Sequence, residues 1–273
     1  MLTYGNIWSR KKGKPSVYQN QPPVSRGKRG GGSKKEKASR GLTLASLPGY
    51  NDAMPNANDT FLKWTHGNSK LQKTSGESFK IVGYGISADT DINGVNSCPG
   101  ASACRGVCYA KQGTYLFKNV REARFFNLNA SFLPEYSDML VNDLAKVSRK
   151  YNTVRIHDSG DFHTQAYLDA WKRAASVFPN VTFYAYTKSM HLDLFSNLPV
   201  NFKLVQSLGG KYDNKVNLDM PHSRIFSDDD ARIRAGYVDG NINDLPAILG
   251  DVKIGLVYHG VKKLTGPQKD YFA

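Results

Sequence analysis

Strand-like and helix-like stretches alternate along this chain from about residue 78 onwards, and this order restricts the fold more than any other feature. Runs rich in β-branched and aromatic residues predict strands at 79–86, 153–157, 181–186, 202–207, 224–226 and 252–258. Apolar residues at helical spacing predict helices at 120–132, 134–150, 164–178, 191–196 and 228–235. Repeated strand–helix–strand order favours a parallel sheet with right-handed crossovers.

Two architectures fit this order. About six parallel strands can form an open, doubly wound sheet or a partial (β/α) barrel, and the pattern does not choose between them. In both architectures, the functional site lies at the carboxyl ends of the strands. We therefore predict an α/β fold and expect the functional residues in the segments that directly follow the strands.

The charge of the chain is concentrated at its N-terminus. The chain of 273 residues carries a formal net charge of +14, and residues 1–40 hold eleven Lys or Arg and one acid, Glu36, which gives +10. This segment is also rich in Gly and Pro, so we predict that residues 1–45 form a disordered basic arm. Residues 46–273 are expected to form a single α/β domain. The arm is either a nonspecific nucleic-acid-binding segment or a solubilising tail.

Composition excludes several classes of protein. No apolar run approaches the 18 or so residues that span a bilayer, and the basic N-terminus lacks the apolar region of a secretory signal. Three cysteines in a chain of this length do not make a disulfide scaffold. We therefore expect a protein of the reducing cytoplasm, with no membrane partner; the sequence does not predict its oligomeric state.

All three cysteines lie in one short loop after the first predicted strand. Cys98, Cys104 and Cys108 have the spacing C-x5-C-x3-C, and Gly100 lies within the loop. Thiolates are the ligands that soft metal ions and iron–sulfur clusters prefer. Three ligands leave one coordination position open, as a catalytic site requires. The alternatives are a closed zinc site completed by a histidine and three thiols without a shared role.

Small polar residues follow three successive predicted strands. His157-Asp158-Ser159-Gly160-Asp161-Phe162 links the second strand to a helix, and Asp161 or Thr164 could alternatively cap that helix. Thr187-Lys188-Ser189 and Ser207-Leu208-Gly209-Gly210 follow the next two strands. His222 and His259 are weaker candidates. We interpret the strand ends as a ligand-binding edge.

These motifs together resemble the phage gene product 88 family and, more distantly, the radical S-adenosylmethionine superfamily. The resemblance rests on the CPG…C…CYA loop at 98–110, the HDSGDF segment at 157–162 and the FYAYTKS segment at 183–189, and it extends over about residues 79–260. The cysteine spacing is longer in both gaps than the C-x3-C-x2-C of the superfamily, and its Gly-Gly-Glu-Pro sequence is absent.

The resemblance implies a partial (β/α) barrel, a [4Fe-4S] cluster and S-adenosylmethionine as the second cofactor. Carried over by position, Cys98, Cys104 and Cys108 would be the cluster ligands. The residues that would lie against S-adenosylmethionine are Ser159, Gly160, Asp161, Thr187, Lys188 and Ser207.

The leading functional hypothesis is a phage-type iron–sulfur enzyme of the host cytoplasm. Reduction of the cluster by an electron donor would cleave S-adenosylmethionine to a 5′-deoxyadenosyl radical, and the substrate is not predicted. A second hypothesis is a zinc-dependent hydrolase with Asp158 or Asp161 as the base. A third is a non-catalytic nucleic-acid-binding protein in which the metal only stabilises the loop.

Overall fold

The structure is a computed structural model that describes residues 60–76 and 78–258. The predicted basic arm at 1–45 lies outside the described residues, as does the weak candidate His259. None of the helices in the described ranges combines the length and the apolar character that crossing a membrane would need.

An eight-stranded sheet forms the centre of the fold, with the strand order β1-β2-β5-β6-β7-β8-β10-β9. Its strands are β1 (Trp64–Thr65), β2 (Ile81–Tyr84), β5 (Thr153–Ile156), β6 (Thr182–Thr187), β7 (Phe202–Ser207), β8 (His222–Phe226), β9 (Val238–Asp239) and β10 (Lys253–Val257). All neighbouring pairs from β2 to β9 are parallel, and β1 alone is antiparallel to its neighbour. The prediction of an α/β fold with a parallel sheet is therefore confirmed.

The six strands expected from the sequence correspond to β2, β5, β6, β7, β8 and β10. From β2 to β8 they lie side by side in chain order, without the reversal that marks a doubly wound sheet. Within the described residues β1 and β9 form the two edges and do not pair with each other, so this sheet is open. Closure into a barrel is therefore not part of the observed fold.

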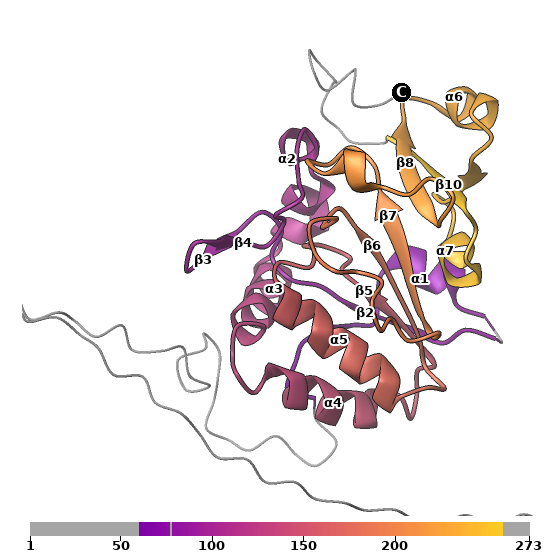
Figure 1. The fold of residues 1–273 in the computed structure, drawn as a ribbon. Helices are drawn as coiled ribbons and strands as arrows, with labels where there is room; N and C mark the ends of the chain where they lie inside the picture. The colour runs from indigo at the N-terminus through magenta and orange to yellow at the C-terminus, as the bar shows by residue number, and fades with distance from the viewer. Residues whose placement is uncertain (1–59, 77, 259–273) are drawn as a thin grey trace, which may run out of the picture. The chain divides into compact units, whose positions relative to one another are not determined.

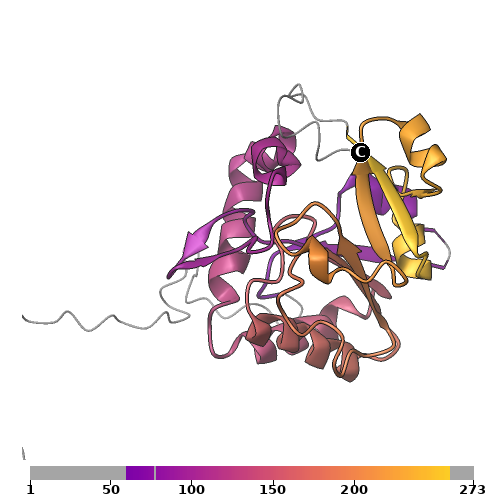
Figure 2. The ribbon, with the colours of Figure 1, turned by 45° about the horizontal axis from the view of Figure 1, so that its top comes forward.

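Helices cover both faces of the sheet (Figures 1 and 2). On one face, α4 (Tyr136–Val147) and α5 (Gln165–Val177) pack against each other and against the strands. On the other face, α1 (Ser69–Thr74) and α7 (Leu245–Leu249) form a smaller apolar cluster with the sheet. Strand residues alternate between the two faces: Phe183 and Ala185 contact the first cluster, whereas Tyr184 contacts the second.

Four predicted helices are observed within a few residues of their expected bounds, namely α3 (Lys118–Ala130), α4, α5 and α6 (Asp229–Arg234). The helix predicted at 191–196 is wrong, because this segment forms turns. The Lys172 ammonium of α5 donates hydrogen bonds to the backbone carbonyls of Asp193 (2.7 Å) and Ser196 (2.9 Å). These carbonyls are satisfied from a neighbouring helix, so the segment does not need an internal helical ladder.

Several short elements were not predicted from the sequence. After β2 the chain forms the hairpin β3 (Asp91–Ile92) and β4 (Val95–Asn96), a single turn α2 (Cys104–Val107), and two 3-10 turns, Tyr109–Lys111 and Gly113–Leu116. A third 3-10 turn, Asp213–Lys215, follows β7. Cys104 lies in α2, and Cys98 and Cys108 lie in the connections on either side of it.

Candidate metal and ligand site at the carboxyl edge of the sheet

The cysteine loop is held against the carboxyl ends of the strands by backbone contacts. Ala101 forms an isolated antiparallel bridge with Gly210, and the Lys211 amide donates to the Gly100 carbonyl at 2.9 Å. A Cβ at Gly100 would stand 2.1 Å from the carbonyl oxygen of Lys188, so the chains approach too closely for any larger residue. The loop after β2 is thereby fixed against the segments after β6 and β7.

The three thiols are free and half-buried. The Asp89 amide donates to the Cys98 sulfur at 3.3 Å. Burial, together with the negative charges of Asp161 and of the other two cysteines, raises the pKa of the Cys98 thiol to about 12, and the hydrogen bond from the Asp89 amide acts in the opposite direction. Burial also raises the pKa of Cys108. Because the thiols influence one another electrostatically, a bound cationic centre would favour their thiolate forms together.

Among the described residues, no three His, Cys, Asp or Glu side chains stand close enough together to hold one metal ion. A cluster makes a different demand, because each of its three thiolates binds a different iron. Cys98, Cys104 and Cys108 are therefore the residues of this chain that could hold such a group.

The turn after β5 packs beneath the cysteine loop. Gly160 has a φ of +83°, and a Cβ there would stand 2.1 Å from the Ile86 side chain, so this position requires glycine. The Ser159 hydroxyl donates to the Ile86 carbonyl at 2.7 Å. The Asp161 amide donates to the Ser97 carbonyl at 2.9 Å, directly before Cys98. The predicted ligand-binding turn is thus joined to the predicted metal loop.

The Asp161 carboxylate is buried and connects two strand ends. It accepts hydrogen bonds from the Thr187 hydroxyl (2.6 Å), the Lys188 amide (2.8 Å) and the Phe162 amide (2.8 Å). Burial raises the pKa of Asp161, whereas these hydrogen bonds act in the opposite direction. The cap of α5 is Thr164, which accepts from the Tyr167 amide at 3.2 Å. Asp161 therefore does not cap that helix.

The remaining predicted site residues lie at the ends of β6 and β7. The Lys188 ammonium donates to the Leu208 carbonyl at 2.6 Å. Burial lowers the pKa of Lys188, and the negative charges of Cys104, Asp161 and Asp213 oppose that change. The Ser207 hydroxyl lies 3.1 Å from the Ser223 hydroxyl of β8. The structure thus brings Lys188 and Asp161 into the surroundings of the cysteines, with Ser207 at the adjacent strand end.

His222, a weaker candidate, is buried with both ring nitrogens engaged. Its Nδ1 lies 2.9 Å from the Met220 carbonyl and its Nε2 lies 2.9 Å from the Tyr237 hydroxyl. These contacts give it a structural role.

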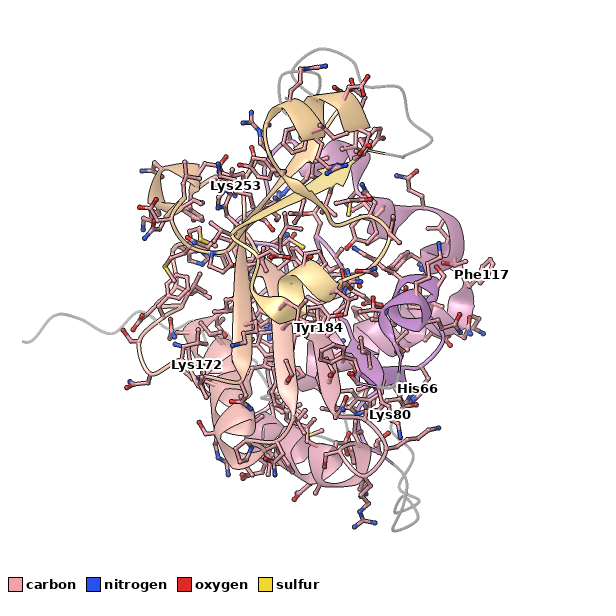
Figure 3. The ribbon with its side chains drawn as sticks, turned by 90° about the vertical axis from the view of Figure 1, so that its right-hand side faces the viewer. His66, Lys80, Phe117, Lys172, Tyr184 and Lys253 are labelled. Carbon is pink, nitrogen blue, oxygen red and sulfur yellow. The ribbon has the colours of Figure 1, made fainter. Side chains whose placement is uncertain are left out.

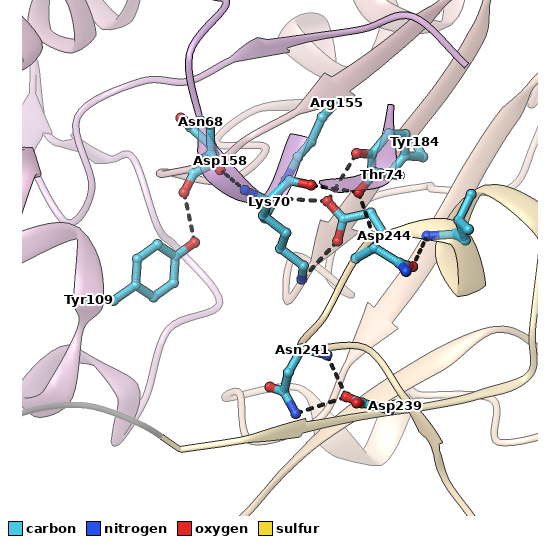
Figure 4. A network of polar contacts seen from close by, with 12 residues as sticks. Asn68, Lys70, Thr74, Tyr109, Arg155, Asp158, Tyr184, Asp239, Asn241 and Asp244 are labelled. Atoms are coloured by element: carbon cyan, nitrogen blue, oxygen red, sulfur yellow. Dashed lines mark hydrogen bonds and ion pairs between the residues drawn. The ribbon is translucent and has the colours of Figure 1, made fainter. Parts of the chain in front are cut away.

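Sequence reasoning missed a polar network on the sheet face opposite α4 and α5 (Figure 4). Asp244 is fully buried and pairs with Arg155 (2.9 Å) and Lys70 (2.8 Å), and the Tyr184 hydroxyl donates to it at 3.0 Å. Burial by itself would raise the pKa of Asp244, but the charges of Arg155 and Lys70 outweigh it and hold that pKa below its ordinary value. The signal for this network was Arg155, a charged residue inside a short apolar strand.

Asp158, which the sequence suggested as a possible base, lies beside the cysteine loop, and its partners were not predicted. Asp158 is buried and forms an ion pair with Arg124 of α3. The hydroxyls of Tyr109 and Tyr115 donate to the Asp158 carbonyl at 2.7 and 3.2 Å. These contacts link the residues that directly follow Cys108 to the end of β5.

Comparison with known proteins gives one consistent result. A family model described as "Gene product 88" matches residues 60–257. The "Gene 88 protein" of Mycobacterium phage D29 is 32% identical over 123 residues, which are 39% of this chain and 51% of that protein. The "Gene 88 protein" of Mycobacterium phage L5 is 31% identical over 122 residues, with the same coverage. The chain thus spans about half the length of these curated relatives, and no solved structure matches it.

Proposed function

The chain belongs to the gene product 88 family, and on that premise we propose that it is an iron–sulfur protein that acts as a radical S-adenosylmethionine-like enzyme. The observation that carries the proposal is the set of three free thiols on one loop, docked at the carboxyl edge of a parallel sheet. Cys98, Cys104 and Cys108 would hold a [4Fe-4S] cluster with one iron left open.

The order of the strands supports a partial (β/α) barrel. Strands β2, β5, β6, β7 and β8 follow one another around the sheet in chain order, as strands do in a (β/α) barrel. In that architecture the cysteine loop and the segments after β5, β6 and β7 would surround one mouth. We propose that these segments form the cofactor site.

The chain's own residues have distinct tasks in this proposal. When bound, a reduced cluster would supply the one electron that cleaves S-adenosylmethionine to methionine and a 5′-deoxyadenosyl radical. Gly160 lets the turn after β5 approach closely, and Asp161 fixes the Thr187 hydroxyl and the Lys188 backbone at this edge. The Lys188 ammonium is held by the Leu208 carbonyl, and its charge interacts with the charges of Cys104 and Asp161. Ser159 and Ser207 would complete the contacts to the second cofactor.

The partners follow from this chemistry. The enzyme requires an electron donor, and the reducing cytoplasm of a phage host is where free thiols persist. The basic arm would attract nucleic acid without base specificity.

The test is the metal content of protein purified without oxygen. We expect brown protein with about four irons and matching sulfide per chain, and 5′-deoxyadenosine on addition of dithionite and S-adenosylmethionine. One tightly bound zinc in colourless protein would instead favour a zinc hydrolase or a zinc-stabilised loop. If the protein bound iron but did not cleave S-adenosylmethionine, it would be an iron–sulfur protein and the proposed radical chemistry would be wrong.

A loop variant tests the ligand assignment. Cys104→Ala removes one of three ligands, so we expect the iron content to fall to near zero after reconstitution. Ser102→Ala is the matched control, because Ser102 lies exposed in the same loop. If Cys104→Ala kept its iron, the assignment of Cys104 would be wrong.

A further inference from the structure

A groove of about 570 Å³ lies at the opposite, amino edge of the sheet, away from the cysteines. It opens beside the start of β2 and the end of α4, and Figure 3 shows His66 and Lys80 together there. Its volume is in the range of small-ligand sites. The residues that line it are His66, Leu71, Gln72, Ser75, Lys80, Ile81, Arg149, Lys150 and Tyr151.

The described lining of the groove carries three cationic side chains and no acidic one. Lys80, Arg149 and Lys150 are exposed, none of the described residues that line the groove is acidic, and no ion pair within the described ranges involves these three. Arg149 and Lys150 follow the C-terminus of α4, where the negative end of the helix dipole stabilises cations. Lys80 belongs to no helix, so the dipole does not account for a cation at that position. Lys73, which does not line the groove, is a further exposed cation in the last turn of α1, the helix that contributes Leu71 and Gln72 to the lining.

The interior of the groove is apolar and aromatic. Leu71 and Ile81 are almost fully buried and form its floor. The ring of His66 stacks on Tyr151 with centroids 5.3 Å apart, and its Nδ1 lies 2.9 Å from the Tyr151 hydroxyl. The Lys150 ammonium lies 5.4 Å from the centre of the same ring. The pKa of His66 is lowered by burial and then by the charge of Lys150, so the cation acts inside the groove.

We propose that this groove binds a nucleotide unit of single-stranded nucleic acid. The apolar floor and aromatic wall suit a base, and Gln72 and Ser75 offer polar groups for its edge. The cations at the rim suit the backbone phosphates on either side. A duplex keeps its bases stacked inside and would not present one to the floor, whereas a free nucleotide would leave part of the extended positive surface unused.

The proposal does not depend on the cluster. None of the lining residues belongs to the cysteine loop or to the segments after β5, β6 and β7. The groove would bind single-stranded nucleic acid whether or not the opposite edge of the sheet binds iron. Loss of iron-dependent chemistry and loss of nucleic-acid binding are therefore measured separately.

The test compares two full-length variants that lose the same charge. One combines Lys80→Ala, Arg149→Ala and Lys150→Ala; the control combines Lys118→Ala, Arg121→Ala and Lys253→Ala, which are exposed residues outside the groove. Binding of a labelled single-stranded oligonucleotide of about a dozen residues is measured by fluorescence anisotropy across a salt series. Thermal unfolding verifies that both variants remain folded.

We expect the groove variant to bind about tenfold more weakly than the control at moderate salt. The slope of the logarithm of its binding constant against the logarithm of the salt concentration should become shallower by about two, because each of three lost phosphate contacts contributes roughly 0.7. Equal affinity of the two variants would overturn the proposal. Two further arms use adenosine monophosphate and a duplex of the same sequence. Binding of either as tightly as the single strand, with the same loss in the groove variant, would also overturn it.

Discussion

At the scale of single residues, Asp161 was predicted to contact a ligand, and in the structure it links the ends of neighbouring strands by hydrogen bonds. Its carboxylate accepts hydrogen bonds from Thr187, Lys188 and Phe162, and its amide reaches Ser97. A carboxylate has about four acceptor positions, so most of its capacity is already used inside the protein. We therefore infer that Asp161 contributes to the site mainly by positioning its neighbours.

We predict that Asp161→Asn lowers the free energy of unfolding by about 1–3 kcal/mol, because the amide turns a donor toward groups that themselves donate. Urea unfolding of the metal-free protein measures this. Asp138→Asn is the control, since Asp138 lies exposed in a surface ion pair with Arg173 and its loss should cost about 1 kcal/mol at most. Equal stability of the two variants would show that the hydrogen bonds of Asp161 do not stabilise the fold.

Two buried histidines make the stability depend on pH. Burial lowers the pKa of His163 to about 4, and burial with the nearby charge of His163 lowers the pKa of His157 to about 3. The unfolded chain binds these protons near pH 6.5, so it gains protons before the folded chain does. The stability contributed by the neutral rings is complete above pH 6.5 and is lost as the pH falls toward 4.

Between pH 7 and 4, we predict that the free energy of unfolding falls by about 3 kcal/mol less in His163→Phe than in the unmodified protein, at roughly 1.4 kcal/mol per pKa unit. Phenylalanine keeps the stacking of His163 on Phe132 and Tyr167 but does not titrate. The measurement is the difference in unfolding free energy between the variant and the unmodified protein at several pH values between 7 and 4. A difference that stays constant across this range would show that His163 does not titrate in it.

At the scale of elements, the position of the cysteine loop depends on how closely it approaches the segments after β6 and β7. Gly100 packs against the Lys188 carbonyl, and Ala101 pairs with Gly210. The thiols are therefore held in place by backbone contacts with residues about a hundred positions away in the chain.

We predict that Gly100→Ala displaces the loop, because its Cβ would stand 2.1 Å from the Lys188 carbonyl. The expected destabilisation is about 1–3 kcal/mol, with faster reaction of the cysteines toward a thiol reagent. Gly67→Ala is the control, since no atom lies within 4 Å of the added Cβ there. Unchanged thiol reactivity in Gly100→Ala would show that the loop position does not depend on this contact.

At the scale of the whole described domain, Asp244 joins parts of the chain that are far apart in sequence. Its carboxylate pairs with Lys70 of α1 and Arg155 of β5 and accepts from Tyr184 of β6, while its amide donates to Thr74 at 2.9 Å. One buried acid therefore fixes the start of α7 and all of α1 on the same face of the sheet.

We predict that Asp244→Asn lowers the free energy of unfolding by about 3 kcal/mol, because it leaves Arg155 buried without its counter-charge. Thermal or urea unfolding measures the loss. The control is Asp229→Asn, whose ion pair with Arg232 is exposed on the Asp229 side. A loss no larger than that of the control would mean that the network does not hold the two helices.

The class of the fold and its main elements were readable from the sequence. Apolar periodicity is a local property, so α4, α5 and the six principal strands were predicted near their observed bounds. The candidate edge was also readable, because the carboxyl ends of parallel strands meet at one side whatever the details of packing. The cysteines and the polar turns after β5, β6 and β7 do lie at that edge.

Tertiary structure alone decided the rest. The segment 191–196 has a helical pattern, but its carbonyls are bound by Lys172 from another helix. The partners of Asp161 and Asp244 lie tens of residues away, and hydrogen bonds over such separations leave no periodic trace in a sequence. The basic groove combines residues near 70, 80 and 150 in the same way. Local sequence determines which elements form, whereas burial and charge pairing between distant elements determine what each polar side chain contacts.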